Sequence, residues 1–309
     1  MTEDWQQRPN LGNPIEGTGP NREGLARVAK GITSEFSGVK FEFKDQLICG
    51  NTVVIRSKFT GTVKGPPPGM TELPQWPGVP AEKVLGKSFE IMTLDVHIIK
   101  NGLIARTWHL ENWAPAFAQM LTGAPPNAME NPPIGPGEDV KYIPQSVKIF
   151  FDRLLSDPSG DGQNPQVIAQ AITEDWNTRP NFFNLEKGDG PTRQNFTQLT
   201  GTFGIQFSKF DFTRMQTLLC GDKVVVISKW DATIKGPVPG MDIILPWVGI
   251  PAEKLIGKSF STWAIDIDTI RNGLIKQTWH IEDYSSALVQ MINGSPTQDF
   301  GFEKSFFEL

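Results

Sequence analysis

The hydrophobic pattern of the second half of the chain begins with helical spacing. Apolar residues recur three or four positions apart in residues 147–155, which is the period of one helix face. A second helix is expected to start with Asn164 as its cap and Pro165 in its first turn, and to run to Trp176. Residues 196–207 carry a weaker third helical pattern. We therefore expect three helices before the first long strand.

Strand-like segments follow these helices, in residues 224–233, 257–270 and 274–282, and residues 285–292 close the pattern as a short helix. Asn272 and Gly273 separate the last two strands. Asn-Gly is the strongest short signal for a two-residue hairpin, because both central residues need a positive φ. Helices followed by an antiparallel meander predict the α+β class.

The same pattern occurs twice in the chain. His109 and His280 lie in nearly identical stretches, 280 − 109 = 171 residues apart. At this offset Thr2–Gly123 aligns with Thr173–Gly294 without a gap, and about four in ten positions are identical. Self-similarity of this kind marks duplicated structural units. The period is longer than a solenoid repeat, so the chain is one whole module written twice.

The repeat predicts four segments, namely module one (residues 1–123), a proline-rich linker (124–144), module two (145–295) and a phenylalanine-rich tail (296–309). Module one has no counterpart of residues 147–171, so we predict an N-terminally truncated first copy. Its uncovered apolar surface must be buried, by module two, by a second copy of the chain or by the tail. The stiff linker either holds the modules apart or is pinned to one surface.

Composition excludes several classes of partner. Hydrophobic residues make up 39% of the 309 residues and charged residues 20%, as in ordinary globular proteins. A net charge of −5 gives no basic footprint for nucleic acid or an anionic membrane. No apolar run approaches the length that spans a bilayer, and the acidic, polar N-terminus does not resemble a signal peptide. We expect neither a nucleic-acid partner nor a membrane partner.

The two cysteines, Cys49 and Cys220, occupy the same repeat position. One cysteine per module cannot form a disulfide within a module. We therefore predict buried free thiols in a reducing compartment, and a cytoplasmic protein.

Alternation along the last strand predicts its two faces. One face carries Ile275, Gln277, Trp279, Ile281 and Asp283, and we expect it to be the wall of a closed cavity. The other face, with His280 and its alternate neighbours, looks solvated or like an interface. In module one the cavity face carries Ile104, Arg106, Trp108, Leu110 and Asn112. Asp283 thus has only the uncharged Asn112 as its counterpart.

Acidic residues also mark the preceding strand, where Asp266 and Asp268 share a face. This strand pairs with the last one across the Asn-Gly turn, so we expect Asp266, Asp268 and Asp283 to line one apolar pocket. Burial and mutual repulsion would raise their pKa values, which makes a carboxylate a usable acid or base near pH 7. The alternative is that these acids are hydrogen-bonded structural groups, or solvated.

In module one the counterparts of these two acids are Asp95 and His97. His97 is either a base held by its carboxylate neighbour or a satisfied polar residue. His109 and His280 are expected to be structural or to lie at an interface. With three histidines and no paired ligand spacing, we expect no metal site.

Tryptophans recur at matched positions, as Trp5 with Trp176, Trp76 with Trp247 and Trp108 with Trp279. They either fill the core or form flat walls of a binding site. The glycine- and proline-rich loops 65–70 and 236–241 resemble stiff lids over a cavity mouth. Aromatic walls with few charges suit a hydrophobic or polycyclic small molecule.

Motifs in a fixed order connect these elements to a known family. In module two they are Asp175-Trp176, Gly221-Asp222, Lys235-Gly236, Pro251-Ala252, Gly257-Lys258, Asp266, Asn272-Gly273, and Trp279 followed by Asp283. Module one repeats them from Asp4-Trp5 to Trp108. This order resembles the SnoaL-like polyketide cyclases, also called ester cyclases, of the nuclear-transport-factor-2-like superfamily.

The resemblance implies two tandem cone-shaped barrels, each a strongly curved antiparallel sheet with helices over an apolar pocket. It also implies acid–base chemistry without a cofactor. The family's acid at the end of the last strand corresponds to Asp283. Arg8 and Arg179 stand where the family often has histidine, which indicates a different substrate.

Our first hypothesis is a cofactor-independent cyclase or isomerase that acts on a polyketide-like or other hydrophobic carbonyl compound. The candidate proton-transfer residues are Asp283, Asp266, Asp268, His97 and Asp95. The candidate substrate-binding residues are Trp176, Arg179, Trp247, Gln277, Trp279, Trp5, Arg8, Trp76, Arg106, Trp108 and Asn112. The alternatives are a non-catalytic binding or scaffolding protein and a hydrolase of epoxides or esters. We expect the modules to pack as a pseudo-dimer, and homo-oligomers are compatible with the sequence.

Overall fold

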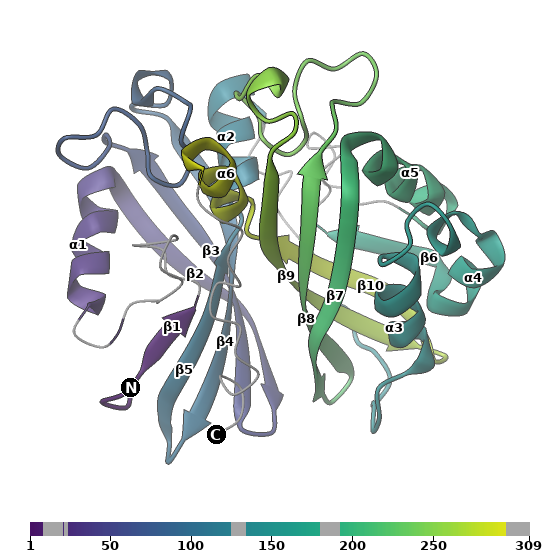
Figure 1. The fold of residues 1–309 in the computed structure, drawn as a ribbon. Coiled ribbons are helices and arrows are strands. Elements are labelled where there is room, and N and C mark those ends of the chain that lie inside the picture. Colours follow the sequence, from purple (N-terminus) through teal and green to yellow (C-terminus); the bar gives the residue numbers. More distant parts are fainter. Residues whose placement is uncertain (9–20, 22–23, 125–133, 180–191, 295–309) are drawn as a thin grey trace. The chain divides into compact units, whose positions relative to one another are not determined.

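The computed structural model describes residues 1–8, 21, 24–124, 134–179 and 192–294. The chain forms two compact units (Figure 1). Unit 1 contains residues 1–123 and the chain from Asp283 onward, and unit 2 contains residues 124–282. The predicted tail and the proline-rich part of the linker, residues 125–133, lie outside the described residues.

In the described part of unit 2, five strands form one sheet in the order β6-β10-β9-β8-β7. The strands are β6 (Ile172–Arg179), β7 (Phe207–Cys220), β8 (Lys223–Ile234), β9 (Ser259–Arg271) and β10 (Leu274–Glu282). β6 runs parallel to β10, and the other neighbours are antiparallel. The predicted meander is confirmed, with β6 added at one edge.

The helices of unit 2 are α3 (Gln145–Ile149), which continues as a π-helical turn (Phe150–Leu154), α4 (Pro165–Ala171) and α5 (Phe196–Gln206). The Asn164 side chain caps α4 by accepting a hydrogen bond from the Gln166 backbone N–H at 3.0 Å, as predicted. The expectation that α4 continues to Trp176 is wrong. The β-branched residues Ile172 and Thr173 favour extended backbone, and this segment pairs with β10 instead.

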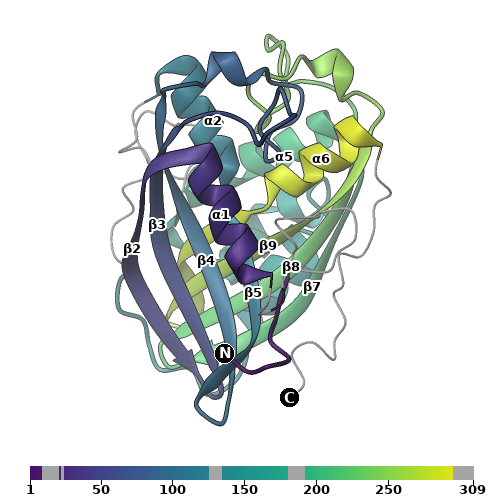
Figure 2. The same cartoon turned by 90° about the vertical axis from the view of Figure 1, so that its left-hand side faces the viewer.

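The sheet of unit 1 has the order β1-β5-β4-β3-β2 in the described residues, again with a parallel edge strand. Its strands are β1 (Gln6–Arg8), β2 (Phe36–Cys49), β3 (Thr52–Val63), β4 (Ser88–Lys100) and β5 (Leu103–Glu111). Its helices are α1 (Leu25–Glu35), α2 (Trp113–Thr122) and α6 (Tyr284–Asn293). Figure 2 shows α1 lying across this sheet. α6 lies beside α2, although the repeat places it at the end of module two.

The predicted Asn-Gly hairpin is present, with φ of 53° at Asn272 and 72° at Gly273. The Glu138 carboxylate accepts hydrogen bonds from the backbone N–H groups of both turn residues, at 2.8 and 2.7 Å. The backbone N–H of Val140 donates to the Gly221 carbonyl at 2.8 Å. The described end of the linker is therefore pinned to one surface, that of unit 2.

A β-bulge follows the hairpin and sets the register of β10. Ile275 pairs with Ile270, but Gln277 pairs with Thr269, so Lys276 is an extra residue. Unit 1 has the same irregularity between Ile104 and Arg106. One extra residue turns every following side chain to the other face of the sheet. The expectation assumed unbroken alternation and so placed Ile275 on the Trp279 face, whereas the bulge puts Ile275 on the His280 face, together with Asp266 and Asp268.

The helices identify the covered face of the unit 2 sheet. The Trp176 ring centroid lies 5.9 Å from that of Phe150 and 5.6 Å from that of Phe196. The same indole N–H donates to Thr278 Oγ1 at 3.1 Å. Thr278 and His280 therefore project toward the helices, and Trp279 projects away from them. We call the Thr278 side of the sheet the helix-covered face.

Both cysteines are disulfide-bonded, so the prediction of free thiols is wrong. The sequence argument had excluded only a bond within one module. The inference of a reducing compartment, which depended on free thiols, no longer stands. Among the described residues, no helix is both long and apolar enough to cross a membrane.

Candidate functional site

A histidine held between two carboxylates forms the centre of the candidate site in unit 2. The register of β9 and β10 places His280 directly opposite Asp266. His280 Nδ1 lies 2.7 Å from Asp266 Oδ1, and its Nε2 lies 3.3 Å from Glu282 Oε1. The side chains of Asp266 and Glu282 are only 3% and 9% exposed. This triad lies on the helix-covered face.

Asp268 lies on the same face, two residues further along β9 than Asp266. It is opposite Thr278, whose hydroxyl donates to Asp268 Oδ1 at 2.7 Å. The Thr278 hydroxyl in turn accepts the Trp176 N–H. Among the described residues, neither Asp268 Oδ2 nor Asp266 Oδ2 has a hydrogen-bond partner, and both residues are buried. Such atoms in folded proteins normally bind a ligand group or ordered water.

Burial and charge pairing shift the protonation of this cluster. Burial raises the pKa of Asp268 well above its usual range, and the charge of Asp266 raises it further. Burial alone lowers the pKa of His280, but the charges and hydrogen bonds of Asp266 and Glu282 outweigh it, and the pKa is raised well above the ordinary value. These shifts favour the protonated forms of both His280 and Asp268.

Unit 1 contains a related cluster at the matched positions. His109 Nδ1 lies 2.8 Å from Asp95 Oδ1, and its Nε2 lies 3.3 Å from Glu111 Oε1. Trp5 donates to Thr107 Oγ1 at 2.9 Å, as its counterpart does in unit 2. The difference is His97, which stands in the place of Asp268 and bonds to Thr107 through Nδ1 at 3.0 Å.

The protonation pattern of unit 1 differs at that position. Burial alone lowers the pKa of His109, but Asp95 and Glu111 outweigh it, and the pKa is raised well above its ordinary value. Burial lowers the pKa of His97, an effect that Asp95 opposes and His109 reinforces. Burial raises the pKa of Asp95, but His109 outweighs it and the pKa is lowered overall. His97 is therefore neutral near pH 7.

Asp283, expected at the centre of the site, caps α6. Its Oδ1 accepts the Ser286 backbone N–H at 3.0 Å, and its Oδ2 accepts the Ser286 hydroxyl at 2.5 Å. It is buried as expected, and burial raises its pKa. Asp283 belongs to unit 1, whereas Asp266 and Asp268 belong to unit 2. The expected group of three acids is therefore not built within one unit.

The other predicted binding residues occupy several environments. Trp279 and Trp108 are buried, and each alternates with its neighbouring triad histidine, so they lie on the face opposite the triads. Their place in a cavity wall stays a prediction. Gln277 lies on that same face, and its Nε2 donates to Asn177 Oδ1 at 3.3 Å. Arg106 donates to the Asp4 carbonyl at 3.0 Å.

The remaining aromatic candidates pack against other rings. Trp76 stacks on Phe117 at a centroid distance of 4.5 Å, and Trp247 meets Phe260 edge-on at 5.2 Å. Asn112 is fully buried, and neither polar atom of its amide has a partner among the described residues. The side chains of Arg8 and Arg179 lie outside the described residues.

Sequence reasoning missed the triad histidines and their second carboxylates, namely His109, Glu111, His280 and Glu282. The available signal was the spacing of 14 residues between Asp266 and His280, repeated between Asp95 and His109. That spacing brings two side chains opposite each other only if the hairpin contains one extra residue. The signal becomes readable only after the bulge is known.

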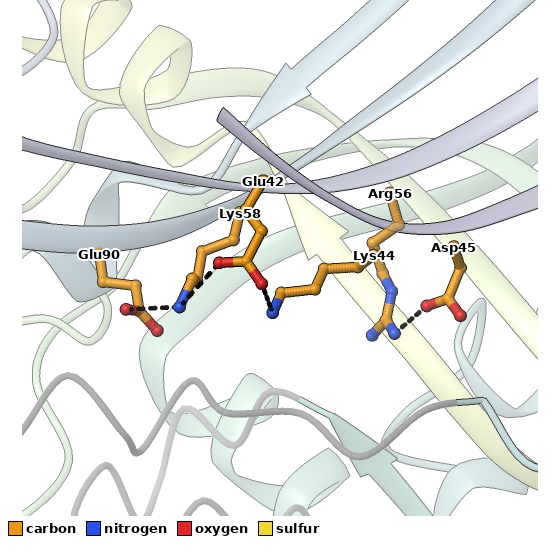
Figure 3. Close-up of polar contacts among 6 residues, drawn as sticks. All are labelled: Glu42, Lys44, Asp45, Arg56, Lys58 and Glu90. Carbon is orange, nitrogen blue, oxygen red and sulfur yellow. Dashed lines mark hydrogen bonds and ion pairs between the residues drawn. The ribbon is translucent and has the colours of Figure 1, made fainter. Parts of the chain in front are cut away.

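The opposite face of the unit 1 sheet carries ion pairs (Figure 3). Lys58 lies between Glu42 and Glu90, at 3.5 and 3.1 Å, and Arg56 pairs with Asp45. Arg56 and Lys58 pair with β4 residues that alternate with Asp95 and His97, so these ion pairs do not reach the triad. Within the described ranges, no group of three or more histidine, cysteine or acidic side chains is arranged to hold a metal ion.

The fold and the site define a class of protein, in which an α+β module presents buried acid–base groups on the helix-covered face of a curved sheet. Residues 10–120 match the family described as SnoaL-like polyketide cyclase. Module one matches this family model over most of its length, and module two repeats its sequence and strand order. The family resemblance read from the motifs is confirmed.

Solved structures with related folds each cover about half of the chain. TsrD from Streptomyces laurentii is 19% identical with a TM-score of 0.37, covering 49% of this chain and 98% of its own. A putative polyketide cyclase from Bacillus cereus is 18% identical with a TM-score of 0.34, and the match covers 48% of this chain and 78% of that protein. IdmH from Streptomyces antibioticus, a putative polyketide cyclase, is 15% identical with a TM-score of 0.36, and the match covers 47% of this chain and 95% of that protein. No curated protein matches the sequence.

Proposed function

We propose that module two is a cofactor-independent acid–base catalyst of the cyclase or isomerase type, acting on a hydrophobic carbonyl compound. Asp268 transfers the proton, and His280 supplies positive charge for the developing enolate. This moves the proton-transfer role from Asp283, which is engaged in capping α6, to an acid on the helix-covered face.

One observation carries the proposal, namely the state of Asp268. It is 0% exposed, one of its oxygens is held by Thr278, and the other has no partner in the described structure. Burial raises its pKa well above the usual range, and a carboxyl group with a raised pKa is a better proton acceptor and donor near neutral pH. The oxygen without a partner is the atom that would meet the substrate.

The reaction follows from these two groups. In its ionised form, Asp268 takes a proton from the carbon next to the carbonyl. The C–H electron pair becomes the C=C bond of an enolate, and the carbonyl π pair moves onto oxygen. The partly buried imidazolium of His280 stabilises that charge more strongly than water would. Return of the proton to another carbon gives an isomer, and attack of the enolate carbon on a second carbonyl closes a ring.

The test is α-proton exchange of an apolar ketone. We expect the protein to catalyse deuteration of 1-tetralone at its α-carbon in D₂O, followed by proton NMR. D268N should lower this rate by roughly 10²–10³-fold, as for the loss of a general base.

D211N is the matched control, because Asp211 is an exposed acid of β7 in the same unit, and its rate should equal that of the wild type. Full exchange by D268N would contradict the role of Asp268. Binding of 1-tetralone without exchange would instead support a non-catalytic binding protein.

A further inference from the structure

One row of side chains in unit 1 runs from the triad toward the edge of the sheet. Register places Thr107 on β5 opposite His97 on β4, His97 opposite Val53 on β3, and Val53 opposite Ile48 on β2. Residues paired across strands lie on one face, and Thr107 alternates with His109, so the row shares the face of the triad. It ends at β2, the last strand of the described sheet.

Helices cover the matching row of unit 2, which consists of Thr278, Asp268, Val224 and Leu219. There α3 and α4 pack on β10, and the π-helical turn after α3 packs on β7. Asp268 and Val224 are each 0% exposed. In unit 2 the row is therefore closed to solvent.

The row of unit 1 is open in the described structure, because module one has no counterpart of the segment that forms these helices. Ile48 is 65% exposed and Val53 is half-buried. Phe41, on the same face of β2, is 50% exposed, whereas its counterpart Phe212 is 8% exposed and stacks on Phe151. An apolar strip thus extends from His97 to the edge strand.

The neighbours of His97 determine which of its nitrogens carries the hydrogen. Thr107 Oγ1 accepts the Trp5 indole N–H at 2.9 Å and lies 3.0 Å from His97 Nδ1. Thr278 makes the same two contacts in unit 2, where its hydroxyl donates to Asp268. By the same arrangement the Thr107 hydroxyl donates to Nδ1. Burial lowers the pKa of His97 and so favours the neutral ring, whose one hydrogen then lies on Nε2.

This Nε2–H is a donor that the protein does not use. Among the described residues it has no acceptor. Val53 is one strand away from His97 and Ile48 is two strands away. Neighbouring strands lie about 4.8 Å apart, so the strip is roughly 10 Å long, which matches an extended chain of about eight carbon atoms.

The charges beside the strip indicate a neutral ligand. The triad of unit 1 holds the carboxylates of Asp95 and Glu111 around one histidine, and two negative charges against one positive charge disfavour an anion. A hydrogen-bond acceptor without charge, such as a carbonyl oxygen, fits the Nε2–H. A linear apolar chain fits the strip.

We infer that unit 1 carries an open binding site for a linear aliphatic carbonyl compound. Its oxygen accepts the His97 Nε2–H, and its chain lies over Val53 and Ile48. The site differs from that of unit 2 because it offers a donor where unit 2 offers a carboxyl group. It does not depend on proton transfer by Asp268.

NMR of protein labelled with ¹⁵N-histidine tests the site, because the chain has only three histidines and H97Q identifies the His97 signals. We expect a neutral His97 ring with its hydrogen on Nε2. Titration with 2-hexanone and 2-octanone should shift the His97 signals saturably, with Kd falling about two- to fourfold per added CH₂. 2-Decanone should gain little more, because its chain passes beyond the edge strand.

I48E should weaken binding of 2-octanone about tenfold, since it places a charge on the strip at an exposed position. L85E is the matched control. Leu85 is 46% exposed in the same unit, and its neighbour Gly86 bonds to Val63, ten residues along β3 from Val53. L85E and D268N should bind 2-octanone like the wild type.

Three results would each overturn the inference. They are a hydrogen on Nδ1 of His97, His97 signals that no ketone shifts, and an affinity that is the same for 2-hexanone and 2-octanone. An equal loss of affinity in I48E and L85E would also contradict it, because the ketone would then not lie on the strip. D268N separates this site from the proposed function, since it should abolish α-proton exchange and leave this titration unchanged.

Discussion

Asp268 and His97 occupy the same repeat position, yet burial shifts their pKa values in opposite directions. Burial disfavours the charged form, so it raises the pKa of the acid and lowers that of the histidine. Burial thus favours the uncharged form of each group beside a triad histidine. The two modules therefore present the same triad beside an acid in one and beside a histidine in the other.

The triad histidine of unit 2 should make stability depend on pH. The pKa of His280 is raised above its unfolded value, so the folded state binds more protons than the unfolded state between those two values. Its contribution is complete below about pH 6.5 and is lost as the pH rises through the folded pKa, at up to about 1.4 kcal/mol per pH unit. H280Q should therefore flatten the fall in the free energy of unfolding between pH 7 and 9.

Urea unfolding followed by tryptophan fluorescence at several pH values measures this slope. The groups that face His280 and hold its proton are Asp266 and Glu282, with Asp268 one residue pair away. Equal slopes for the wild type and H280Q would show that the imidazolium is not stabilised by folding.

Among the elements, the β9–β10 hairpin depends on a residue from outside it. Glu138 accepts both turn amides, and it thereby satisfies the backbone of a turn whose positive φ values leave those amides pointing outward. E138A should speed hydrogen exchange of the Asn272 and Gly273 amides about tenfold and lower the free energy of unfolding by about 1 kcal/mol. D139A is the control, since Asp139 is an exposed neighbour.

Exchange is read by NMR at the two turn amides against those of the Gly221 turn. If the two turn amides exchange at the same rate in E138A and D139A, Glu138 does not stabilise the hairpin.

Sequence patterns predicted the elements better than their faces. The helices around residues 147–155 and 196–207, the hairpin at Asn272 and the class were readable, because spacing and turn chemistry are local. The extension of α4 was wrong, because the edge of β10 offers backbone partners that no local pattern reveals. The bulge at Lys276 leaves no sequence signature. Because of it, Asp266 and Asp268 share a face with His280 and not with Trp279.

The site was predictable only in part for the same reason. Asp266, Asp268, Asp95 and His97 were identified by residue type on one strand face. Their partners on the next strand, His109, Glu111, His280 and Glu282, could be found only once the register was known. The sequence did not show that Asp283 caps α6, although an acid just after a strand is also a preferred cap of a following helix.

At the scale of the whole molecule, the state of the cysteines can be measured directly. Both are disulfide-bonded, so protein denatured without reductant should contain no titratable thiol, and reduction should release two thiols per chain. Removing a native disulfide typically costs about 2–5 kcal/mol, so reduction should lower the denaturant midpoint. Thiols are quantified with a chromogenic disulfide reagent. Two titratable thiols per chain before reduction would contradict the disulfide-bonded state of the cysteines.

The bulge also indicates the order in which the features of this protein arose. Both copies carry the extra residue at the same repeat position, with the same histidine and the same two carboxylates around it. A shared insertion that inverts a strand is most simply inherited once, so the single ancestral module already had this arrangement before the gene doubled. The exchange of Asp268 for His97 then belongs to the later history, in which each copy was free to acquire its own chemistry.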